Sequence, residues 1–232
     1  MDIILIAGLW LRSSIWDDVA AELTRLGHRP RPLDLPGADD ASPMATLDDQ
    51  LAAAVAAVDG AQRPLVVGHS AASTLAWMVA DSRPTSIAGT AMIGGFPASN
   101  GTTYADFFPT EDGVMAFPGW KPFDGPDADD LDEAARRNLE SAAVPVPAGV
   151  STASVRYHDD RRWGVPAVVV CPEFSPEQAR AWLDAGDIPE LAAAAQLDFV
   201  DIASGHWPMV TRPVELARIL ANCADGLRAP GS

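Results

Sequence analysis

The chain has 232 residues, of which 48% are hydrophobic and 21% are charged, and its formal net charge at pH 7 is −16. This length and composition support a sizeable core, so we expect one folded domain over residues 1–232. The acidic balance excludes nucleic acid and anionic membranes as expected partners, because a phosphate backbone or an anionic surface requires a basic protein surface.

No charged-then-apolar leader opens the sequence, and no stretch of about 18 apolar residues occurs in it, so neither export nor a membrane span is predicted. The two cysteines, Cys171 and Cys223, form no motif. We expect both to be buried and free, and we expect a cytoplasmic location.

Short apolar runs alternate along the chain with longer stretches of helical period. This alternation predicts strands at 3–7, 29–35, 64–68, 86–96, 165–171 and 196–203. It predicts helices at 14–27, 46–58, 71–82, 176–185 and 212–227, with a short helical piece at 188–195. Ser14 and Thr46 are predicted to cap the first two helices. Because parallel strands need helix-length crossovers, the fold class predicted is α/β, with a mainly parallel central sheet flanked by helices.

The alternation breaks between residues 97 and 150, which are rich in Pro, Gly and Asp and carry scattered aromatic residues. One helix is predicted here, at 128–142. Long unstructured loops are uncommon in compact domains, and the aromatic residues can form a small apolar face of their own. We therefore interpret 97–150 as a cap or lid inserted into the domain, with a disordered loop as the alternative.

Ser70 lies in PLVVGHSAAS, residues 64–73, between a predicted buried strand and a predicted helix. A tight turn in this place exposes the serine hydroxyl, and the N-terminus of the following helix stabilises an oxyanion. The turn needs small neighbours, which Gly68 and Ala72 supply. A serine here can also be only a helix cap, so the segment by itself leaves both interpretations open.

His206 lies in a short loop between the last predicted strand and the final helix. The carboxyl ends of parallel strands meet at one edge of the sheet, so His206 is expected beside Ser70, where it can act as a base. His69 is the weaker base, because on an extended chain it points away from Ser70. His28 and His158 lie in polar stretches and are expected at the surface.

Four segments, in this order, resemble the α/β-hydrolase superfamily and its small, cofactor-free serine esterases. They are AGLWLRSSIW (7–16), similar to the oxyanion loop; LDLPG (33–37), similar to the turn after the second strand; strand-GHSAA-helix (64–82), similar to the nucleophile elbow; and SGHWPM (204–209) with its following helix, similar to the catalytic-histidine loop. The resemblance covers almost the whole chain apart from 97–150. It implies the α/β-hydrolase fold and an activity that needs no cofactor and no metal.

By this resemblance Ser70 is the nucleophile, His206 is the general base, and the backbone amides of Leu9 and Ala71 form the oxyanion hole. The sequence departs from the family's motifs at three places. Ala7 in place of histidine is expected to be tolerated, because the oxyanion donor is a backbone N–H. Ala72 in place of glycine is expected to crowd the turn modestly, and Ala38-Asp39 in place of His-Gly is expected to be structural.

The third member of the triad is an acid. In the family it lies within a few residues after the strand that corresponds to the one predicted here at 165–171. The segment CPEFSPEQ contains no aspartate, and Glu173 is the only carboxylate before the next helix. Its longer side chain can reach the second ring nitrogen of the histidine and fix its tautomer. In the alternative, Glu173 is a solvated residue near a helix start, and the acid is Asp106, Asp187 or Asp34.

Aromatic and sulfur-bearing side chains near these motifs can line an apolar substrate pocket: Trp10, Phe96, Phe108, Phe117, Trp120, Trp207 and Met209. Trp10, Phe96 and Trp207 are the predicted substrate-binding residues, and core packing is the alternative for those in 97–150.

These features together predict a serine hydrolase that cleaves a small, largely apolar carboxylic ester or lactone through an acyl-enzyme. Its expected partner is this small-molecule ester, and the sequence indicates no oligomeric state. The same triad can also serve a thioesterase, a hydroxynitrile lyase or a perhydrolase. A non-catalytic ligand-binding protein on the same scaffold is the alternative from another functional class.

Overall fold

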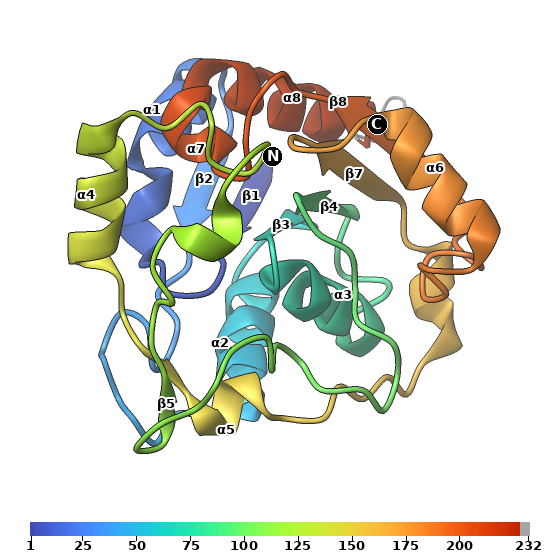
Figure 1. Cartoon of the computed structure of the whole chain (residues 1–232). Coiled ribbons are helices and arrows are strands. Elements are labelled where there is room, and N and C mark those ends of the chain that lie inside the picture. The colour runs from blue at the N-terminus through green and yellow to red at the C-terminus, as the bar shows by residue number, and fades with distance from the viewer. Residues whose placement is uncertain (228–232) are drawn as a thin grey trace.

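The computed structural model describes residues 1–227. Its main sheet has six strands in the order β2-β1-β3-β4-β7-β8, and each neighbouring pair is parallel (Figure 1). The strands are β1 (Asp2–Ile6), β2 (Arg29–Pro32), β3 (Leu65–His69), β4 (Gly89–Ile93), β7 (Ala167–Cys171) and β8 (Leu197–Asp201). The predicted parallel α/β sheet is therefore confirmed.

Helices cover both faces of this sheet (Figure 1). One face carries α1 (Asp17–Arg25) and α8 (Pro213–Gly226), and the other carries α2 (Leu47–Asp59), α3 (Ala72–Ser82) and α6 (Pro176–Ala185). The shorter or peripheral helical elements are α4 (Glu133–Ala142), α5 (Ala148–Ser151), α7 (Pro208–Thr211), and the 3-10 turns η1 (Ser13–Trp16), η2 (Lys121–Phe123) and η3 (Asp160–Gly164).

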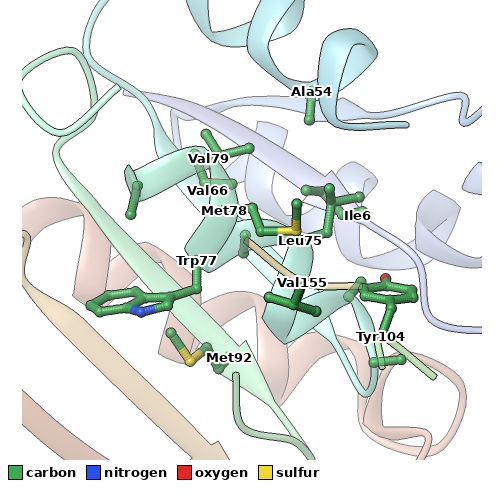
Figure 2. Packing of buried hydrophobic residues seen from close by; sticks show 14 of the residues in the cluster. Ile6, Ala54, Val66, Leu75, Trp77, Met78, Val79, Met92, Tyr104 and Val155 are labelled. Carbon is green, nitrogen blue, oxygen red and sulfur yellow. The ribbon is translucent and has the colours of Figure 1, made fainter. Parts of the chain in front are cut away.

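The core has two parts, one on each face of the sheet. Side chains alternate along β1, so that Ile4 and Ile6 belong to the part covered by α2 and α3, whereas Ile3 and Leu5 belong to the part covered by α1 and α8. Figure 2 shows the first part, where Leu75 of α3 lies close to the sheet and side chains from later in the chain complete the packing. A strand buried on both faces reads as a continuous apolar run, which is why β1, β3, β4 and β7 were predictable.

Four predicted strands are shorter in the structure than expected. β7 starts at Ala167 rather than at residue 165, and β8 spans only Leu197–Asp201 of the predicted 196–203. β2 ends at Pro32 rather than at residue 35, and β4 spans only Gly89–Ile93 of the predicted 86–96. β2 is an edge strand, which is where proline is tolerated in a sheet. The turn that follows β2 is held by Asp39, whose carboxylate accepts hydrogen bonds from the amides of Ser13 and Leu35.

The predicted helix starts had different outcomes. Thr46 caps α2 as predicted, because its Oγ1 accepts from the Asp49 amide while the Asp49 carboxylate accepts from the Thr46 amide. The cap predicted at Ser14 is wrong, since this residue lies inside η1 and α1 starts only at Asp17. The helical piece predicted at 188–195 is also wrong: this stretch forms turns, within which the Glu190 carboxylate accepts from the Asn100 amide and from Arg162.

Two of the predictions for individual side chains need correction. His28 is buried rather than at the surface, since the chain turns after α1 and carries it beneath α8, where Nε2 lies 3.8 Å from Asp225. His158 is exposed as predicted. Cys171 is buried and free, as predicted, whereas Cys223 is free but only partly buried.

The segment 97–150 leaves the sheet after β4 and returns before η3, and it is drawn from green to yellow in Figure 1. It contains η2, α4, α5 and a small antiparallel pair, β5 (Val114–Met115) with β6 (Val146–Pro147). Helix α4 begins at Glu133 with Asp132 as its N-cap, later than the predicted start at 128. Its partly buried face, with Ala135 and Leu139, packs on the α1/α8 part of the core.

Within residues 1–227, no helix combines the length and the hydrophobicity that crossing a membrane would require.

Candidate active site

Ser70 occupies a sharp turn between β3 and α3. Its φ is +55°, a left-handed conformation that costs a non-glycine residue roughly 1–3 kcal/mol and that is concentrated at functional sites. The Ser70 amide donates to the carbonyl of Ile93 at 2.8 Å, which fixes the turn against β4. A Cβ at Gly68 would overlap the backbone carbonyl of Ala72, so strand and helix approach as closely as the sequence predicted. Ala72 itself is accommodated in this turn as a buried residue.

His206 and Glu173 form a hydrogen-bonded pair at the same edge of the sheet. His206 follows β8 and Glu173 follows β7, and Nδ1 of the histidine lies 2.8 Å from Oε1 of the carboxylate. Both side chains are 14% exposed. Gly94, at the end of β4, has a φ of +58°, and a Cβ there would lie 3.1 Å from His206 Nδ1 and 3.2 Å from Glu173 Oε2. The pair therefore fits because this position has no side chain.

The other carboxylates considered for the triad are engaged elsewhere or make no contact with His206. Asp34 accepts a hydrogen bond from Ser13 Oγ at 2.5 Å. Neither Asp106 nor Asp187 shares a hydrogen bond or ion pair with the histidine in the part of the chain that the structure describes. Of the four candidate acids, Glu173 is the one brought to the histidine.

Ser70 and His206 line one cavity, together with His69. The described residues contain no hydrogen bond between Ser70 Oγ and His206 Nε2.

His69 holds the histidine loop in place, a role that sequence reasoning missed. Its Nε2 lies 2.7 Å from the backbone carbonyl of His206, so Nε2 carries the proton and donates it. Burial, together with the nearby His206, lowers the pKa of His69 to about 3, so this imidazole stays neutral. From the sequence we expected only that His69 points away from Ser70. The contact with the His206 carbonyl was not foreseen, because His206 lies 137 residues away in the chain.

The proposed oxyanion donors flank the serine. Ala71 directly precedes the first residue of α3, and Leu9 lines the cavity beside Ser70. A Cβ at Gly8 would lie 3.2 Å from Ser70 Cβ, so the loop that carries Leu9 runs against the nucleophile. Within residues 1–227 the amide groups of Leu9 and Ala71 donate no backbone hydrogen bond. Both N–H groups can therefore donate hydrogen bonds to an oxyanion that develops beside Ser70.

The cavity has a volume of about 70 Å³ and is mostly apolar. Trp10 and Trp207 line the cavity as predicted, and so do Phe108, Phe117 and Trp120 of the segment 97–150. Sequence reasoning missed five further lining residues: Leu11, Phe107, Phe123, Leu139 and Ala143. Trp10 is fixed by its indole N–H, which donates to the Met115 carbonyl at 3.1 Å. Trp207 packs edge-on against Trp120, with ring centroids 5.3 Å apart.

Two of the predicted lining residues lie elsewhere. Phe96 lines a neighbouring, more open hollow, which also reaches Ser70 and Ala71. Met209 is part of the core between the sheet and α8, and is wrong as a cavity residue.

A second carboxyl group, that of Asp127, lies near the His206–Glu173 pair and belongs to the segment 97–150. Burial raises the pKa of Asp127, the proximity of His206 lowers it, and the proximity of Glu173 raises it again. Among residues 1–227 no group of three or more His, Cys, Asp or Glu side chains has an arrangement that could hold a metal ion.

Comparison with known proteins places these features in context. The sequence model described as "Alpha/beta hydrolase family" matches residues 3–219. No curated protein sequence matches the chain.

Solved structures with a similar fold cover nearly the whole chain. An extracellular alpha/beta-hydrolase from a Paenibacillus species, described as sharing structural and functional homology with tobacco salicylic acid binding protein 2, has a TM-score of 0.79 at 18% identity and covers 97% of this chain and 99% of its own. A pyrethroid hydrolase from Sphingobium faniae has a TM-score of 0.72 at 18% identity, covering 99% and 98%. Tomato methylketone synthase I, complexed with 2-tridecanone, has a TM-score of 0.72 at 15% identity, covering 98% of each chain. At these identities the likeness shows a shared fold.

Proposed function

The chain belongs to the alpha/beta hydrolase family, and from that premise we propose that it is a serine hydrolase that cleaves a small, largely apolar carboxylic ester or lactone. The observation that carries this proposal is the convergence of three side chains at one edge of the sheet. Ser70 is presented on a strained turn, His206 opens into the same cavity, and Glu173 binds the far ring nitrogen of the histidine.

The hydrogen bond between His206 Nδ1 and Glu173 Oε1 assigns a role to each nitrogen of the His206 ring. When Nδ1–H of His206 donates to Glu173, Nε2 is left unprotonated and faces the cavity as a base. It takes the proton of Ser70 Oγ as this oxygen attacks the substrate carbonyl, and Glu173 stabilises the imidazolium that results. His206 then protonates the leaving alcohol, and a water activated by the same base hydrolyses the acyl-enzyme.

The backbone amides of Leu9 and Ala71 stabilise the tetrahedral intermediate. Amide N–H groups beside a helix N-terminus are fixed dipoles that need no reorganisation when charge develops. One such donor contributes roughly 3–4 kcal/mol to lowering the barrier in enzymes of this chemistry.

The cavity supports a small substrate. Its volume of about 70 Å³ lies well below the roughly 300–1,000 Å³ of common drug-sized ligand sites. Trp10 and Trp207 supply flat apolar walls of this cavity, and Phe96 offers a further apolar contact in the neighbouring hollow. We assign the segment 97–150 as a cap on a single domain of residues 1–232, because its aromatic side chains close this cavity.

We propose further that the reaction needs neither a cofactor nor a metal and that the binding partner is the small-molecule ester itself. We also propose a cytoplasmic location for the protein. The solved structures that share this fold are named as a pyrethroid hydrolase and a methylketone synthase, so the fold by itself does not fix the reaction, and the triad carries the proposal.

Turnover of a short-chain p-nitrophenyl ester by the wild type and by Ser70→Ala tests this function. We expect Ser70→Ala to lose at least 10³-fold in kcat, since the acyl-enzyme cannot form. Ser73→Ala is the matched control: this hydroxyl lies one turn further on, 3.4 Å from the Gly68 carbonyl and outside the cavity. Equal rates for wild type and Ser70→Ala would favour a non-catalytic ligand-binding protein. A series of esters with increasing acyl length then defines the preferred substrate.

A further inference from the structure

The peptide groups of His206 are held from both sides. Its carbonyl accepts the hydrogen bond from His69, the residue before the nucleophile. Its amide donates to the carbonyl of Asp127 at 2.7 Å, and Asp127 belongs to the segment 97–150. The backbone that carries the base is therefore fixed between the serine turn and the cap.

Asp130 adds a second set of contacts from the same part of the cap. Its Oδ2 accepts from the Gly205 amide at 2.9 Å and from Ser204 Oγ at 3.1 Å. A Cβ at Gly205 would overlap the Asp127 carbonyl and Asp130 Oδ1. Residues 127–130 are thus in direct contact with the loop that carries His206, and this close contact is possible because Gly205 has no side chain.

Residues 127–130 are themselves anchored. Ala128 is buried, and its carbonyl accepts from the Arg136 guanidinium at 2.6 Å, while the same guanidinium lies over the Trp120 ring at 5.6 Å. Trp120 lines the cavity. The part of the cap that closes the cavity is therefore connected to the part that holds the histidine loop.

We propose that Asp130 is a positioning residue for His206, and that residues 127–130 form a clamp by which the cap sets the place of the base relative to Ser70. The inference rests on the proposed function, in which His206 transfers the proton. Without the Asp130 carboxylate, the amide of Gly205 and the hydroxyl of Ser204 lose this acceptor, and the loop is held on this side by the Asp127 carbonyl alone. A shift of the imidazole by about 1 Å is sufficient to cost on the order of 10²-fold in rate.

The test compares Asp130→Ala and Asp130→Asn with the matched controls Asp129→Ala and Asp129→Asn. Asp129 is the exposed neighbour, and its carboxylate has no hydrogen bond or ion pair within residues 1–227. We expect Asp130→Ala to lower kcat by roughly 10- to 100-fold with KM changed less than about twofold. Asp130→Asn should lie between it and wild type, because the amide oxygen can still accept a hydrogen bond. Both Asp129 variants should match wild type.

A second measurement does not depend on turnover: the downfield proton resonance of the Nδ1–H···Glu173 hydrogen bond. We expect a sharp resonance in wild type and Asp129→Ala, and a broadened or absent one in Asp130→Ala with an unchanged Tm. Wild-type kcat together with an intact resonance in Asp130→Ala would overturn the clamp. If wild type hydrolyses no ester while the resonance still depends on Asp130, the proposed function fails and the positioning of His206 stands.

Discussion

Replacing Glu173 by Gln removes one negative charge from the site and little else. The carboxylate lies against His206 Nδ1 at 2.8 Å and is largely shielded from water. Its second oxygen is buried and has no hydrogen-bond partner among residues 1–227. Two unit charges about 4 Å apart interact by roughly 4 kcal/mol at an effective dielectric constant of 20. This energy is available to the imidazolium that forms in the transition state and is absent in the variant. The expected loss is therefore about 10³-fold in kcat.

The assay is kcat for a short-chain ester, with Glu177→Gln as the control. Glu177 lies on the exposed first turn of α6, four residues further on, so its variant should keep wild-type kcat. KM should change little in Glu173→Gln, because the carboxylate does not line the cavity. A Glu173→Gln variant with wild-type kcat would refute the assignment of this residue to the triad.

Three further predictions concern the fold that holds the site. Gly68→Ala should lower the free energy of unfolding by about 1–3 kcal/mol and reduce kcat, because its Cβ meets the Ala72 backbone; wild-type stability in urea would contradict this. Asp81→Ala should cost about 3–5 kcal/mol in urea unfolding, because it leaves the buried Arg162 with one carboxylate fewer; a cost below about 1 kcal/mol would be inconsistent. Hydrogen bonding to Arg29 lowers the pKa of Asp2 to about 2, so Asp2→Asn should lower the free energy of unfolding by about 2 kcal/mol at pH 7. The difference in stability between wild type and variant should vanish as the pH falls from about 4 toward 2, because Asp2 then becomes protonated. A difference that does not depend on pH would contradict this prediction.

Much of the sheet was predictable because its buried strands are short apolar runs with helical segments between them. The Ser70 turn and the His206 loop were predictable for a related reason. Ser70 directly follows the buried strand β3, and His206 lies in the short loop after the edge strand β8, so the place of each at the sheet edge follows from the topology. Glu173 required only the same argument applied to β7.

The features that the sequence did not reveal are polar contacts between distant segments. The bond from His69 to the His206 carbonyl and the contacts of Asp130 with the histidine loop link residues 137 and about 75 positions apart. No local period marks such a pair, because each residue is polar and lies in a turn or loop or at a strand end. The burial of His28 was missed for the same reason, since this residue lies against Asp225 of α8, almost 200 residues further along the chain.

The identity of the nucleophile is the central claim, and covalent labelling tests it most directly. The folded protein is treated with a fluorophosphonate, digested, and the modified peptide is mapped by mass spectrometry, with Ser70→Ala treated in parallel. The account predicts one adduct on Ser70 in wild type and none in the variant. An adduct on another residue, or no adduct on the folded wild-type protein, would contradict it.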